Sequence, residues 1–92
     1  MGMSERDEVI YKAIDEILWK DWDPIGINEN ENIRDEYQGY TPHVFTLKIQ
    51  GADVHKIAQH LYKLETIDMG MTGDKELVLN HCKTIAQKII EL

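Results

Sequence analysis

Hydrophobic residues along the chain gather in four segments with a period near 3.6 residues, the spacing of one face of an α-helix. We predict helices at about 5–20, 42–50, 54–67 and 75–91. The first and last carry the clearest apolar stripes, and the expected core positions are Val9, Ile10, Ala13, Ile14, Ile17 and Leu18, followed by Leu77, Val78, His81, Cys82, Ile85, Ala86, Ile89 and Ile90. No segment alternates in the manner of a β-strand. The pattern predicts one all-α domain, 1–92, with its main seam between the first and last helices.

Residues that cap helices stand at the predicted boundaries. Side chains that can accept a backbone hydrogen bond occur where each helix should begin, at Ser4, Thr41, Asp53 and Asp74. Pro42 supports the second of these starts, because proline is tolerated only in the first turn of a helix. Gly51 and Gly70 are expected to end the second and third helices, since glycine adopts positive φ at little cost.

The stretch from Trp19 to Pro42 has no sustained period, yet it holds both tryptophans of the chain. Its composition predicts a long loop between the first two helices of a compact four-helix domain, fixed by side-chain docking. We expect Trp22 to anchor this loop in the core, because a buried indole removes about 150–250 Å² from water. The expected structural anchor comprises Trp22, Asp23, Pro24 and Gly26. At this bend the Asp23 carboxylate should accept amide hydrogens from Ile25 or Gly26.

A second group of residues, at the far end of the same stretch, is a candidate binding face: Asp35, Glu36, Tyr37 and Tyr40. We expect the two acids and one of the two tyrosines to be partly exposed. Such an acidic, aromatic-edged face suits a partner that presents Lys or Arg, through charge and cation–π contacts. The alternative is a solvated helix start without a binding role.

Composition limits the classes of partner. The chain has 92 residues, 42% of them hydrophobic and 29% charged, as in an ordinary single globular domain. The formal net charge of −7 and the dispersed basic residues disfavour nucleic acid and anionic membrane surfaces as partners, and favour a basic partner. No apolar run reaches the roughly 20 residues of a membrane span. The sole cysteine and the lack of a charged-then-apolar leader favour a reducing cytoplasm.

No complete metal or cofactor motif is present. The start of the loop copies part of a calcium-binding EF-hand, but Ile25 stands where an oxygen ligand is needed and Asn32 replaces the bidentate glutamate, so we predict no calcium site. Candidate ligands for a transition metal are His43, His55, His60, His81 and Cys82. Neighbours among them point in different directions on a helix, so a site would need convergence between helices, and we predict none. Cys82 lies on an apolar stripe and should be buried and inert.

The chain resembles the YugE-like family of small bacterial proteins from Trp22 onward. The landmarks that carry the resemblance are Trp22-Asp23-Pro24-Ile25-Gly26, Asp35-Glu36-Tyr37, Tyr40, Pro42, Gly51-Ala52, Ile57, His60-Leu61, Glu65 and Met69-Gly70-Met71. The resemblance implies a compact all-helical domain of a cytoplasmic bacterial protein, and it implies no catalytic residue. Between the tyrosines this chain has Gln38-Gly39, where members of that family often have an aspartate and a small residue.

Three functional hypotheses follow. The leading one is a small non-enzymatic protein-binding or regulatory module, because no nucleophile, glycine-rich phosphate loop or complete triad occurs in the sequence. The first alternative is a small hydrolase or ligand-binding enzyme that uses Asp23, Asp35 and Glu36, and it would require a deep pocket with converging carboxylates. The second alternative is a structural homodimer.

Overall fold

The computed structural model describes residues 4–23, 26, 37–70 and 73–92. Within these ranges the protein is all-α, with four helices and no strand. The elements are α1 (Glu5–Ile17), the π-helical turn η1 (Leu18–Trp22), α2 (Thr41–Ile49), α3 (Val54–Lys63), the π-helical turn η3 (Leu64–Asp68) and α4 (Lys75–Ile90). A 3₁₀ turn at residues 37–40 leads into α2. The predicted fold class is confirmed.

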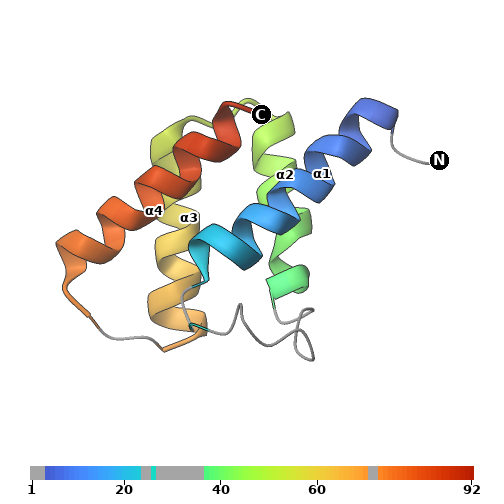
Figure 1. Ribbon diagram of the computed structural model, residues 1–92. Helices are drawn as coiled ribbons and strands as arrows, with labels where there is room; N and C mark the ends of the chain where they lie inside the picture. Colours follow the sequence, from blue (N-terminus) through green and yellow to red (C-terminus); the bar gives the residue numbers. More distant parts are fainter. Residues whose placement is uncertain (1–3, 24–25, 27–36, 71–72) are drawn as a thin grey trace.

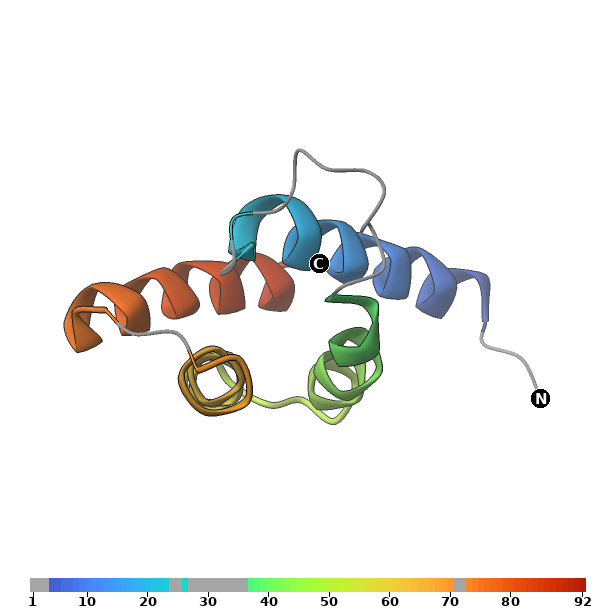
Figure 2. The ribbon, with the colours of Figure 1, turned by 90° about the horizontal axis from the view of Figure 1, so that it is seen from below.

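The helices form two layers that cross each other. In Figure 2, α1 and α4 run across the view in one layer, while α2 and α3 are seen nearly end-on in the other. Figure 1 shows that α2 and α3 run in opposite directions and are joined by a short connection at one end. The chain reverses there at Gly51, whose φ of 79° is a value that glycine adopts without the steric cost of a Cβ atom.

The largest interface in the bundle is between α3 and α4. The prediction that the first and last helices form the main seam is therefore wrong. Figure 2 shows the reason, because α1 and α4 lie side by side only near η1 and the C-terminal part of α4. The first turns of both helices project past this overlap. Two expected core residues are consequently exposed to solvent. Val9 has 68% of its surface exposed and Leu77 has 71%.

Three of the four predicted N-caps are confirmed. The side chains of Ser4, Asp53 and Asp74 each accept a hydrogen bond from an amide in the first turn of their helix. Thr41 is not a cap, because Tyr40 takes that position and Thr41 is the first residue of α2. Instead the Thr41 hydroxyl is buried and donates to the Asp15 carboxylate at 3.3 Å, which ties α2 to α1.

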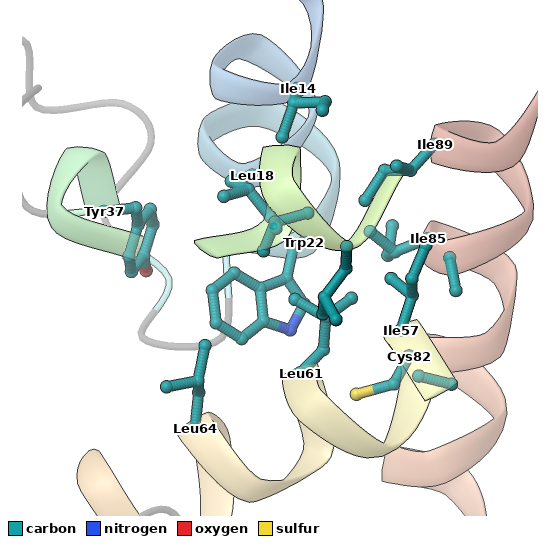
Figure 3. Close-up of a cluster of buried hydrophobic side chains, with 14 of the residues drawn as sticks. Ile14, Leu18, Trp22, Tyr37, Ile57, Leu61, Leu64, Cys82, Ile85 and Ile89 are labelled. Atoms are coloured by element: carbon teal, nitrogen blue, oxygen red, sulfur yellow. The ribbon is translucent and has the colours of Figure 1, made fainter. Parts of the chain in front are cut away.

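The core is built around the indole of Trp22. Figure 3 shows this side chain between Leu61 and Leu64 on one side and the ring of Tyr37 on another, with Cys82 and Ile85 of α4 close by. Trp22 and Tyr37 have 1% and 0% of their surfaces exposed. No helix in the described part of the chain is long and apolar enough to cross a membrane.

Candidate functional site

The aromatic cluster joins the two ends of the stretch singled out in the sequence. Trp22 closes η1, and its ring centroid lies 5.7 Å from that of Tyr37 and 6.2 Å from that of Tyr40. The ring centroid of Trp19 lies 5.9 Å from that of Tyr37. Such tilted and edge-on contacts each add to the free energy gained by burying the rings. The predicted burial of Trp22 is confirmed.

Asp23 differs from the prediction in its hydrogen-bond partner, and its backbone is in an uncommon conformation. Its φ of 31° is in the left-handed region, which few residues other than glycine, asparagine and aspartate adopt readily. Its carboxylate accepts a hydrogen bond of 2.8 Å from the hydroxyl of Tyr37. The amide of Gly26 donates to the backbone carbonyl of Asp23 at 3.1 Å, so the predicted bond from Gly26 to the carboxylate is wrong. Pro24 and Ile25 lie outside the described residues.

The structure describes two of the four residues of the predicted binding face, and these two differ in burial. Asp35 and Glu36 lie outside the described residues. Tyr37 is fully buried and belongs to the core, whereas Tyr40 keeps part of its ring at the surface. Of the two tyrosines, only Tyr40 can therefore contribute to an exposed face.

A surface hollow of about 290 Å³ lies beside the same 3₁₀ turn. It is lined by Tyr11, Lys12 and Asp15 of α1 and by Gln38 of the turn. Its volume is just below the roughly 300–1,000 Å³ typical of small-molecule sites, and it is suited to a single side chain. Only one carboxylate, that of Asp15, lines it among the described residues, so it is not the deep pocket with converging acids that the enzyme hypothesis requires.

Sequence reasoning missed this hollow. Tyr11 and Asp15 are one helical turn apart, which places them on the same side of α1, but the same spacing describes any helix surface. The hollow forms where the turn that carries Gln38 lies against this side of α1, near the contact between Asp15 and Thr41, and nothing local in the sequence signals that contact.

A second group of polar side chains lies where η1, η3 and α4 meet. Glu65 is only 9% exposed, and the Cys82 thiol lies 3.9 Å from its carboxylate. His81 places its Nε2 atom 3.2 Å from the carbonyl oxygen of Trp22. Burial, with a further contribution from the Glu65 carboxylate, raises the pKa of Cys82 to about 12. A thiol with this pKa and no exposed surface is a poor nucleophile, as the sequence predicted.

Stability should fall as Glu65 ionises. Burial raises the pKa of Glu65 above its ordinary value of 4.5, although the nearby His81 acts in the opposite direction. Below pH 4.5 the carboxyl is protonated in both the folded and the unfolded chain; as the pH rises to the higher folded pKa, the folded state releases its proton later and loses stability relative to the unfolded state. Glu65→Gln should therefore raise the free energy of unfolding at neutral pH and flatten its dependence on pH above 4.5, measured by urea denaturation.

The exposed Glu8 provides the matched control for this prediction. Glu8→Gln removes the same charge from a solvated position and should leave the pH dependence in that range as it is in the parent protein. A Glu65→Gln variant that is less stable than the parent at neutral pH would contradict the prediction.

Two of the four histidines converge between helices, an arrangement that the sequence could not show. His43 of α2 and His60 of α3 converge, with ring centroids 4.1 Å apart, whereas His55 is exposed elsewhere on α3. Burial and the neighbouring His43 lower the pKa of His60. Among the described residues, no group of three or more His, Cys, Asp or Glu side chains is placed to hold a metal ion.

Comparison with family models, with curated proteins and with solved structures gives no match for this chain.

Proposed function

We propose that this protein is a small non-enzymatic protein-binding module that recognises a basic side chain of its partner. The hollow between α1 and the turn at 37–40 is the observation that carries the proposal. It offers the ring of Tyr11 and the carboxylate of Asp15 within a space suited to one Lys or Arg side chain, a combination that binds cations through charge and cation–π contacts. The net charge of −7 would favour the approach of a basic partner.

Two neighbouring features support the same partner chemistry. Tyr40 stands partly exposed in the turn that borders the hollow. Asp35 and Glu36 directly precede that turn in the chain, and we propose that they extend the acidic surface. Lys12 acts in the opposite sense, because it brings a positive charge to the lining of the hollow. Its exposed side chain can move aside when a cation enters.

The proposed membership of the YugE-like family rests on the sequence landmarks alone, and it is consistent with a module of this kind. The proposed hydrolase has less support. The carboxylate of Asp23 is engaged by the buried Tyr37, which suits a structural role.

Binding should depend on a cationic side chain in the ligand. A peptide with a single arginine should perturb the NMR amide signals of residues around Tyr11 and Gln38, whereas the same peptide with neutral citrulline should not. Asp15→Asn, and separately Asp35→Asn with Glu36→Gln, should each weaken binding of the arginine peptide by about three- to tenfold, as expected for the loss of about 1 kcal/mol of charge interaction. The double variant should keep its free energy of unfolding within roughly 0.5 kcal/mol of the parent.

Two matched variants separate binding from folding. Lys12→Ala removes the opposing charge and should tighten binding of the arginine peptide. Thr41→Val removes the hydrogen bond to Asp15 without changing charge, so it should lower stability and leave the preference for arginine intact. Equal affinity for the arginine and citrulline peptides, or binding unaffected by Asp15→Asn, would rule out the hollow as the recognition site.

A further inference from the structure

Two imidazole rings meet at the surface between the second and third helices. His43 is in the first turn of α2 and exposed, and His60 is in the last turn of α3 and partly buried. Their ring centroids are 4.1 Å apart, with an angle of 48° between the planes. Both rings come from helices that are fixed by the core, so the helix backbones hold the two side chains together.

One nitrogen of this pair lacks a protein partner. The Nε2 atom of His60 is buried, and no group in the described part of the chain forms a hydrogen bond with it. Leaving a buried polar atom unpaired costs about 1–3 kcal/mol, so an atom of this kind calls for an explanation in a native fold. An imidazole nitrogen is also the side-chain ligand that zinc, nickel and copper ions share.

We propose that His43 and His60 form a two-imidazole binding site for a divalent transition-metal ion such as Zn²⁺, Ni²⁺ or Cu²⁺, which would link α2 to α3. The ion would lie about 2.0–2.1 Å from one nitrogen of each ring, which requires a centroid separation on the order of 5 Å. Because His43 is exposed, a rotation of its side chain can supply this small separation while both helices stay in place. Water would complete the coordination shell.

Of the charged groups around His60, one favours a bound cation and another opposes it. The carboxylate of Asp68, in η3, favours positive charge at His60, and the ammonium group of Lys63 opposes it. The overall charge of −7 raises the local concentration of cations. With two protein ligands and water, binding should be weaker than at a structural zinc site, which has four protein ligands. The site shares no residue with the lining of the hollow, so it is independent of the proposed peptide recognition.

The test is calorimetric titration of the full chain, freed of metal by a chelator, with zinc chloride. We expect one ion per chain. His43→Gln and His60→Gln should each weaken zinc affinity by about tenfold or more, because the second imidazole adds to the first through its high effective concentration. His55→Gln is the matched control, since it removes an exposed histidine from α3 that has no histidine beside it. Its affinity should equal that of the parent protein.

A second readout locates the ion and keeps the test valid if one variant misfolds. Paramagnetic Ni²⁺ should broaden NMR signals of residues around His43 and His60 before those around His55 and His81. Zinc should raise the melting temperature of the parent but not of His43→Gln, whose exposed position makes loss of the fold unexpected. Unchanged affinity in His43→Gln, or an equal loss in His55→Gln, would overturn the proposal and leave only adventitious binding to surface histidines.

Discussion

Replacing Trp22 with alanine is expected to reduce the free energy of unfolding by about 3–5 kcal/mol, the cost of deleting a large buried aromatic side chain from a packed core. Trp22 is 1% exposed and contacts the rings of Tyr37 and Tyr40, so its removal would leave a cavity at the centre of the bundle. A domain of this size has roughly 5–15 kcal/mol of stability in total. The variant should therefore lose a substantial part of its free energy of unfolding, as measured by urea denaturation followed by circular dichroism.

Trp22→Phe is the control for this prediction. It keeps an aromatic ring and removes the buried indole N–H, which lies close enough to the Glu65 carboxyl and the Cys82 thiol to lower the pKa of each. The loss of this polar contact and the smaller ring together should lower stability by only about 1–2 kcal/mol, because most of the buried aromatic surface is kept. A Trp22→Ala variant that loses less than about 1 kcal/mol would show that the aromatic cluster does not anchor the fold.

The helices could be predicted from the sequence because their signals are local. The apolar period and the caps at Ser4, Asp53 and Asp74 act within one or two turns, and the structure shows all three caps with their hydrogen bonds. The π-helical turns η1 and η3 are different. Each extends a helix by one wider turn and contributes a buried residue, Trp22 or Leu64, to the core. Tertiary packing, rather than propensity, accounts for turns of this type.

The relative placement of the helices could not be predicted. The stripe on α1 is equally apolar at Val9 and Ile14, yet Ile14 is fully buried and Val9 is exposed. The difference depends on how far α4 reaches along α1, which is fixed by packing between residues distant in sequence. Both candidate sites arise in the same way, from Asp15 meeting Thr41 and from His43 meeting His60. A single sequence carries the residue types for such sites but not their convergence.

Asp23→Ala is expected to lower the free energy of unfolding by about 2–4 kcal/mol, the second largest effect that the structure predicts. Two causes combine. The carboxylate accepts a 2.8 Å hydrogen bond from Tyr37, whose ring is fully buried, so alanine would remove a hydrogen bond from the edge of the core. In addition, Asp23 has a φ of 31°, and alanine adopts the left-handed region less readily than aspartate.

Matched variants separate these two causes. Asp23→Asn keeps an acceptor for the Tyr37 hydroxyl and tolerates positive φ, so it should cost about 1 kcal/mol or less. Asp23→Gly relieves the backbone but removes the acceptor, and it should fall between asparagine and alanine. Tyr37→Phe removes the hydroxyl, and a double-mutant cycle of Tyr37→Phe with Asp23→Gly should give a coupling energy of about 1–2 kcal/mol. Negligible coupling would show that the hydrogen bond between Asp23 and Tyr37 does not stabilise the fold.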